Sequence, residues 1–182
     1  GNISSTEWQV GGLMGVASDT RIENSYFTGT AKITHQDALT AENRDGSGII
    51  SRIEGGVNSL RGVVSLASEI VSGSANEFIS YGSGGTRLNE SINNFTRDDM
   101  VISPLAAPNR GDQLPRAAAV QKRPIADFKT SALYESIGWD FASVWKMDPV
   151  SSLYPVFLKK GETKVPAIDS NKLLNLKVYS SH

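Results

Sequence analysis

The residues of this chain that could do chemistry are few, and Arg97-Asp98-Asp99 comes nearest to an enzyme constellation. General acid–base cleavage of a glycan needs two carboxylates held at a defined separation in a cleft. Adjacent residues on a strand point to opposite faces, so Asp98 and Asp99 converge only if they lie in a turn. We interpret the triplet as a solvated turn. The alternative is the carboxylate site of a polysaccharide-active enzyme.

His35 is the one internal histidine, and Asp37 and Asp45 lie near it in the sequence. The grouping suggests a metal site or an acid–base pair. However, the chain has no second internal imidazole and no His-Glu-x-x-His spacing, which a zinc site of that kind needs. We therefore expect His35 to be a surface residue in a polar excursion over residues 34–47, which is long for a turn.

Two glycine-containing stretches resemble ligand loops only in part. Asp45-Gly46-Ser47-Gly48 lacks the alternating oxygen ligands and the closing Glu of a calcium loop. Ser83-Gly84-Gly85-Thr86 lacks the Gly-Lys-Ser/Thr ending of a phosphate loop. We predict turns at both. Cys is absent, which excludes thiolate metal sites and a cysteine nucleophile. We thus predict no enzyme, with no catalytic, cofactor-binding or metal residues and no cofactor, and we assign no ligand-binding residue.

Single aromatic and amide side chains carry two interpretations each. We expect Trp8 to pack over the first unit, with a sugar-stacking role as the alternative. Asn24, Asn93 and Asn94 are expected to satisfy turn backbone groups through their own amides, in a ladder between units. Glycan binding by these amides is the alternative.

The elements that must position these residues begin with a strand–turn–strand unit over Val10–Ile33. Its apolar segments, Leu13–Val16 and Ile22–Phe27, are joined by a polar turn, which is the β pattern rather than the helical one. One such unit cannot bury its apolar face alone, so further copies are expected.

Two looser copies follow, over Gly48–Val71 and Asn76–Ile102. In the second, Gly48–Ser51 aligns with Gly12–Gly15 and Leu60–Val64 with Ile22–Tyr26. In the third, Phe78–Tyr81 is the expected first strand and Ile92–Thr96 the second. The spacing is 38 residues from Ile22 to Leu60, and 32 from Leu60 to Ile92.

Repeats of this length indicate a solenoid, a propeller or an array. A propeller blade needs four strands, and we count two or three per unit. We therefore predict an all-β fold: a β-solenoid, similar to a parallel β-helix, with about three rungs.

The run Val10–Gly15, followed by Ile22–Gly29, resembles the GLUG motif of bacterial surface proteins, with Gly12, Leu13, Met14 and Gly15 as its core. Residues 134–145 and 153–158 are similar to the segment that often closes such repeat regions. The resemblance implies a secreted or surface-anchored β-solenoid of adhesin-like proteins, also found beside some secreted proteases. It carries no catalytic residues over to this chain.

We divide the chain into repeats at 1–103, a Pro-rich connector at 104–124, a capping segment at 125–160, and a tail or the start of a next module at 161–182. Four prolines oppose strand pairing over most of the connector.

The capping segment should carry a short helix that begins at Thr130 or Ser131, and a closing strand over Tyr154–Lys159. Its aromatic patch is expected to lie over the last rung, and an exposed carbohydrate platform is the alternative. The patch comprises Trp139, Phe141, Val144 and Trp145, and Trp139 and Phe141 are expected on one side of a strand.

Charge and hydropathy narrow the class of partner. The net charge is −1 and no basic stripe is present, so we expect no nucleic-acid partner. No apolar run is long enough for a membrane-spanning segment.

The start at Gly1 suggests a piece of a longer exported protein. We expect a non-catalytic bacterial cell-surface or secreted module, extracellular and adhesin-like, that binds host or matrix protein or glycan, or serves as a rigid spacer. The alternative is an accessory domain of a secreted protease or polysaccharide-degrading enzyme.

Overall fold

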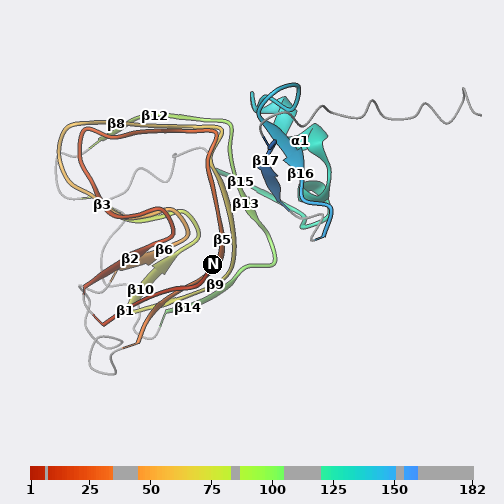
Figure 1. Cartoon of the computed structure of the whole chain (residues 1–182). Coiled ribbons are helices and arrows are strands. Elements are labelled where there is room, and N and C mark those ends of the chain that lie inside the picture. Colours follow the sequence, from red (N-terminus) through yellow and green to blue (C-terminus); the bar gives the residue numbers. More distant parts are fainter. Residues whose placement is uncertain (7, 35–44, 83–86, 105–119, 151–153, 160–182) are drawn as a thin grey trace, which may run out of the picture.

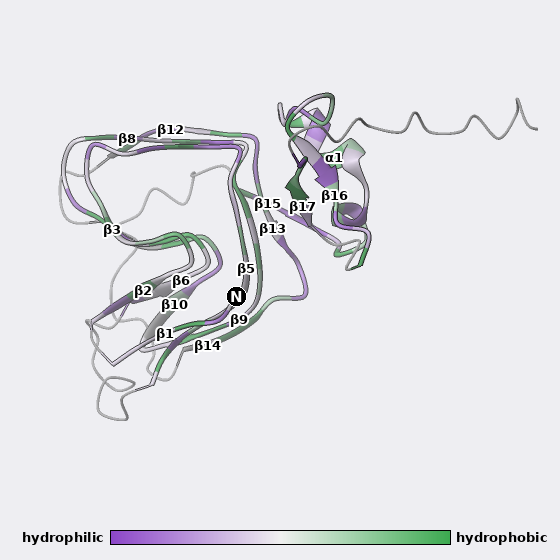
Figure 2. Ribbon diagram, in the orientation of Figure 1, coloured by the Kyte–Doolittle hydropathy of each residue, from purple (hydrophilic) through white to green (hydrophobic). Residues whose placement is uncertain are grey.

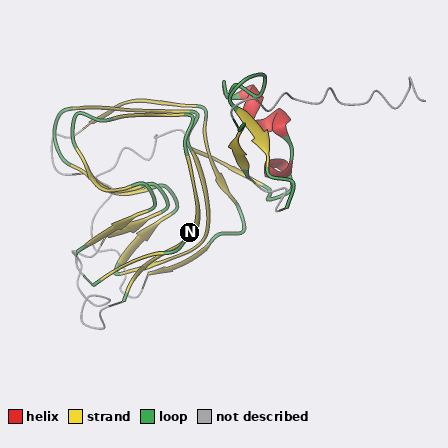
Figure 3. Ribbon diagram, viewed as in Figure 1, coloured by secondary structure: helices red, strands yellow, loops and turns green. Residues whose placement is uncertain are grey.

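The computed structural model is mostly β-strand in parallel sheets, with one short α-helix (Figure 3). It describes residues 1–6, 8–34, 45–82, 87–104, 120–150 and 154–159. Every strand pair described within residues 1–123 is parallel, and one antiparallel pair follows near the C-terminus. The predicted all-β class is confirmed at this level.

The strands fall into three successive units that use the same set of positions. The first unit contains β2 (Gln9–Gly11), β3 (Met14–Ala17), β4 (Arg21–Glu23) and β5 (Tyr26–Ile33). The second contains β6 (Asp45–Ser47), β7 (Ile50–Ile53), β8 (Val57–Arg61) and β9 (Val64–Ser72). The third contains β10 (Ser74–Asn76), β11 (Ile79–Gly82), β12 (Arg87–Ile92), β13 (Asn94–Arg97) and β14 (Val101–Pro104).

The four parallel sheets each combine strands from all three units, so equivalent strands lie side by side (Figure 1). Three sheets have three strands each, in the orders β10-β6-β2, β11-β7-β3 and β12-β8-β4. The largest sheet has the order β1-β5-β9-β13-β15, with β14 also on β9, where β1 is Ile3–Ser5 and β15 is Val120–Arg123. None of the described sheets closes on itself.

The predicted alignment of the first two units is confirmed by the strand register. Met14 pairs with Ile50, and Ile22 pairs with Leu60. The third unit corrects the prediction by one residue, because Leu60 pairs with Ser91 rather than Ile92. A β-bulge between Leu88 and Glu90 shifts the register there, and Ile92 is 40% exposed. The apolar side chain of Ile92 led to its alignment with the buried Leu60, but the two residues do not pair in the fold.

The predicted second strands are each interrupted by a corner. Ile22–Phe27 divides at Asn24 into β4 and β5, and Ile92–Thr96 divides at Asn93 into β12 and β13. Asn24, Gly62 and Asn93 occupy equivalent places and have φ values of 44°, 63° and 55°. Gly and Asn adopt this left-handed conformation most readily, and it turns the chain between two sheets.

The core between the sheets is lined by apolar side chains of all three units, and hydrophobic segments recur in neighbouring strands (Figure 2). Packing of neighbouring units therefore buries what a single unit would leave exposed. The fully buried members include Ile33, Ile49, Ile50, Ile53, Leu60, Val63, Ala67 and Ile70.

The C-terminal segment contains the 3₁₀ turn Asp127–Lys129, α1 (Ser131–Ser136), β16 (Trp145–Met147) and β17 (Pro155–Phe157). The short helix is confirmed, with Thr130 as its N-cap residue and no capping bond from that side chain. The predicted closing strand is β17, which pairs antiparallel with β16. Trp139 and Phe141 are both buried but neither lies in a strand, which corrects the prediction that they share one side of a strand.

The position of this segment also differs from the prediction. It lies beside the outer face of β5, β9 and β13 rather than over the last unit (Figure 1). Tyr26, Val64 and Phe95 are in register and all face outward there. This apolar column spans all three units and needs cover, which the aromatic segment provides.

Two predictions about loops are corrected. Asp45–Ser47, predicted as a turn, is strand β6 and is buried between β2 and β10. Val120–Arg123, assigned to the connector, is strand β15 on β13. His35, Asp37, residues 83–86, 105–119 and 161–182 lie outside the described residues.

Candidate functional site

A cluster of aromatic side chains lies at the contact between the C-terminal aromatic segment and the outer face of β5, β9 and β13. Trp139 donates its indole Nε1–H to the carbonyl oxygen of Gly62 at 2.8 Å. Tyr26 donates its hydroxyl to the carbonyl oxygen of Pro155 at 2.7 Å. One bond ends on the corner of the second unit, and the other begins in the first unit. The segment is therefore anchored to the units at two separate places.

The rings in this contact form a continuous network. Tyr26 lies with its ring centroid 6.0 Å from Trp139, 6.4 Å from Trp145 and 5.8 Å from Tyr154. Burial raises the pKa of the Tyr26 hydroxyl and, more strongly, that of the fully buried Tyr134. Trp139 and Trp145 are 3% and 8% exposed, so their faces are used in packing. The described geometry therefore favours the structural interpretation of the patch over a carbohydrate platform at these two rings.

Arg97-Asp98-Asp99 forms the predicted turn, and its charges are used within it. The Arg97 guanidinium binds Asp99 through two nitrogens, with Nε–Oδ1 at 2.5 Å and Nη2–Oδ2 at 2.7 Å. This pairing, above all its hydrogen bonds, lowers the pKa of Asp99 and raises that of Arg97. Asp98 is exposed, and its backbone N–H donates to the Arg123 carbonyl oxygen at 3.0 Å. The turn thus holds an ion pair rather than two convergent carboxylates.

The Asn94 side chain forms hydrogen bonds with backbone groups, as predicted. Its Oδ1 accepts the Val63 N–H at 2.9 Å, and its Nδ2 donates to the Leu60 carbonyl oxygen at 3.1 Å. The side chain is fully buried, so these bonds satisfy groups that water cannot reach. The equivalent corner residues Asn24 and Asn93 contribute their backbone conformation.

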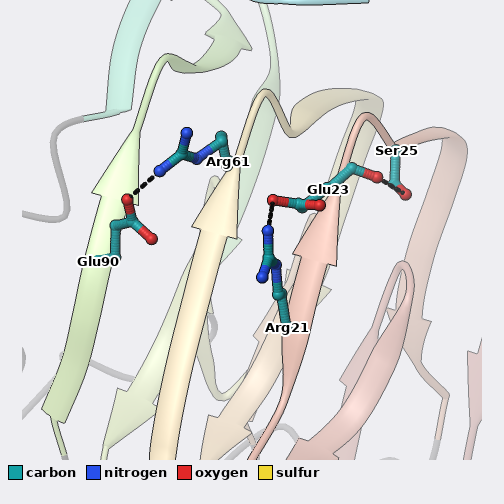
Figure 4. Close-up of polar contacts among 5 residues, drawn as sticks. All are labelled: Arg21, Glu23, Ser25, Arg61 and Glu90. Atoms are coloured by element: carbon teal, nitrogen blue, oxygen red, sulfur yellow. Dashed lines mark hydrogen bonds and ion pairs between the residues drawn. The ribbon is translucent and has the colours of Figure 1, made fainter.

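The outer face of β4, β8 and β12 carries alternating charges (Figure 4). Arg21 contacts Glu23 at 2.6 Å on one strand, and Arg61 contacts Glu90 across two strands. All four side chains are between 36% and 71% exposed. Such exposed pairs contribute little to stability, and here they leave the face without a dominant sign of charge.

The proposed metal grouping is only partly described. Asp45 is buried, its backbone N–H donates to the Trp8 carbonyl oxygen, and its carbonyl oxygen accepts the Ser51 hydroxyl at 2.7 Å. Within the described part of the chain, no group of three or more His, Cys, Asp or Glu side chains could hold a metal ion. Trp8 is 50% exposed, so it is not a core residue.

Comparison with known families decides the nature of the first unit. The family model of the GLUG motif matches residues 6–34. The first unit matches the GLUG motif. It comprises β2 to β5, and its Gly12–Gly15 core spans the corner from β2 into β3. No curated protein and no solved structure matches the chain. The described helices include none long and apolar enough to cross a membrane.

The GLUG glycines have different structural roles. A Cβ atom at Gly12 would lie 2.1 Å from the Gly48 carbonyl oxygen and 2.4 Å from the Phe27 ring. A Cβ atom at Gly15 would meet nothing within 4 Å. Gly12 therefore permits the close approach of backbone and ring inside the stack. The sequence pattern marked both glycines and could not separate these roles.

The anchoring residues Tyr26 and Gly62 were not identified from the sequence. Gly62 forms the left-handed corner, and its carbonyl oxygen accepts the Trp139 hydrogen bond. A usable signal was present: Tyr26, Val64 and Phe95 are apolar at equivalent positions that neighbour the inward Phe27, Ser65 and Thr96. An outward apolar column predicts a covering element.

Proposed function

We propose that the three units form a β-solenoid of about three rungs, and that it is a non-catalytic module of a bacterial surface or secreted protein. In this proposal the module is adhesin-like, extracellular and acts as a rigid spacer that holds other parts of its protein at a fixed distance. The GLUG motif of the first unit and the in-register parallel strands support the assignment.

The observation that carries the spacer role is the lateral position of the aromatic segment. It packs on Tyr26 of the first unit, Val64 and Leu66 of the second, and Phe95 of the third. Cover across all three units opposes sliding or separation of neighbours, which would expose the shared column. A repeat array braced in this way should extend and transmit force as one body.

Mechanical unfolding of the single chain tests this role. Held by its two ends in optical tweezers, the chain should release residues 9–104 in one cooperative step, because the aromatic segment couples the units. Release of the units one at a time, at separate forces, would contradict a braced spacer.

A half-exposed aromatic side chain favours one second function, the binding of a host or matrix ligand. Trp8 is 50% exposed at the N-terminal unit, where an indole could stack on a sugar ring. A glycan and matrix-protein binding screen tests it with Trp8→Ala and Val150→Ala, since Val150 is 91% exposed and far along the chain. Saturable binding that only Trp8→Ala removes would support a binding module. An unchanged profile would leave the spacer role in place.

A further inference from the structure

Arg123 on β15 differs from the other arginines whose side chains the structure describes. Its one side-chain hydrogen bond goes from Nη2 to the Oε1 of Gln121 at 3.0 Å. Its guanidinium carbon lies 5.2 Å from the centroid of the Phe95 ring, and its Nε is buried without a hydrogen-bond partner in the described structure. A carboxylate partner, by contrast, is present for Arg21, Arg52, Arg61 and Arg97.

The strand register adds to the cost of this arrangement. Arg123 pairs with Arg97 across β15 and β13, so two positive side chains project from neighbouring strands about 4.8 Å apart. Asp99 binds Arg97 through two hydrogen bonds, whereas no described carboxylate forms an ion pair with Arg123. A buried N–H without an acceptor also lowers stability. A residue that breaks local rules in this way is typical of a functional site.

The groups beside Arg123 indicate what it binds. Gln121 and Arg123 are two residues apart on one strand, so both side chains lie on the outward face that Phe95 occupies. Gln121 is exposed, and Arg123 occupies its Oε1, which leaves its Nε2–H groups as donors. Guanidinium N–H groups match the two oxygens of a carboxylate, and amide N–H groups match the hydroxyl oxygens of a sugar.

We propose that Arg123 and Gln121 form a binding site for a uronic acid unit of an acidic polysaccharide. Arg123 binds the carboxylate through its remaining Nη–H groups, and Gln121 donates to a neighbouring hydroxyl oxygen. Phe95 supports the guanidinium from the sheet, since a cation is attracted to the face of an aromatic ring. The site lies beside the third unit, whereas Trp8 precedes β2 of the first. It goes beyond the spacer role and does not depend on it.

An NMR titration of the full chain tests this proposal. The probe is a galacturonic acid trisaccharide, its methyl ester is the uncharged control, and a glutamate tripeptide supplies carboxylates without a sugar. Arg123→Met removes the guanidinium and keeps an apolar stem over Phe95. Arg21→Met is the matched control, because the Arg21 side chain is 71% exposed and pairs with Glu23. Asp98→Asn removes a negative charge from the residue whose backbone N–H donates to the Arg123 carbonyl oxygen.

The wild-type chain and Arg21→Met should bind the acid and not its methyl ester, with saturable shifts of the Gln121 side-chain amide. Arg123→Met should bind about tenfold more weakly or worse, because a charge-assisted pair is lost. It should also unfold at the same or a higher urea concentration, since no buried N–H is left without an acceptor. Asp98→Asn should bind the acid more tightly than the wild-type chain.

Equal affinity of Arg123→Met and the wild-type chain, or no binding by the wild-type chain, would overturn the proposal. Equal binding of the glutamate tripeptide would assign the site to acidic protein segments instead, and would also overturn it. Should Arg123→Met not fold, the same conclusion would follow from an unchanged affinity of Asp98→Asn.

Discussion

At the scale of single residues, the two glycines of the GLUG core differ in what surrounds them. A Cβ atom at Gly12 would collide with the Gly48 carbonyl oxygen and the Phe27 ring, whereas a Cβ atom at Gly15 would have open space around it. The motif therefore combines one glycine required by packing with another whose own environment would accept a methyl group. The requirement follows from contacts with Phe27 in the same unit and with the Gly48 carbonyl oxygen in the second.

Replacement of these glycines tests that difference. Gly12→Ala should reduce the free energy of unfolding by about 1–3 kcal/mol or more, because the backbone or Phe27 must shift to admit the methyl group. Gly15→Ala should change it by no more than about 0.5 kcal/mol. Urea denaturation followed by circular dichroism measures both. Equal losses in the two variants would show that the close approach at Gly12 does not exist.

The ion pair of Arg97 and Asp99 has a defined pH dependence. The folded-state pKa of Asp99 is lowered, so its contribution to stability is present above the unfolded-state pKa and is lost as the pH falls through the folded-state pKa. Asp99→Asn should therefore be less stable than the wild-type chain at neutral pH, and the difference should shrink as the pH falls below the ordinary Asp pKa of about 3.9 and through the lowered folded-state pKa. Denaturation at several pH values measures it. Asp98→Asn is the control, and a difference that persists in acid would contradict the pairing.

At the scale of elements, the aromatic segment packs against the outer face of strands from all three units. Its bond from Trp139 to the Gly62 carbonyl oxygen ends at a corner, where a glycine in the left-handed conformation exposes the backbone to the indole. The segment's helix and closing strand could be predicted from capping and alternation patterns. Its position follows only once the units are aligned, because the apolar column of Tyr26, Val64 and Phe95 that it covers takes one residue from each unit.

Loss of the Trp139 bond should weaken the whole assembly. Trp139→Phe leaves the Gly62 carbonyl oxygen without this donor and should cost about 1–3 kcal/mol, as for other buried polar groups. Trp8→Phe, at a half-exposed site, should cost far less. Near-ultraviolet and far-ultraviolet circular dichroism should report one common transition in the wild-type chain. Separate transitions of rings and strands would show that the segment does not brace the units.

At the scale of the whole molecule, the sequence predicted the repeated units better than the register of the third unit and the contacts of the aromatic segment. The alignment of Ile22 with Leu60 followed from the repeated apolar pattern and is confirmed. The third unit was placed one residue out, because the apolar but exposed Ile92 was aligned with the buried Leu60, whose partner in the fold is Ser91. The Arg97-Asp98-Asp99 turn was predicted correctly, whereas the Tyr26 and Gly62 anchors depend on contacts over 129 and 77 residues of sequence.

Disulfide trapping tests the parallel, in-register stack of three units most directly, since the chain has no Cys of its own. Glu23 lies beside Arg61, and Arg61 beside Ile92. Neighbouring strands lie about 4.8 Å apart, within the Cα range of a disulfide. The pairs Glu23→Cys with Arg61→Cys, and Arg61→Cys with Ile92→Cys, should oxidise readily in the folded chain. Arg21→Cys with Arg61→Cys, about 8 Å apart on the diagonal, should not. Equal oxidation of the diagonal pair, or none of the register pairs, would contradict the stack.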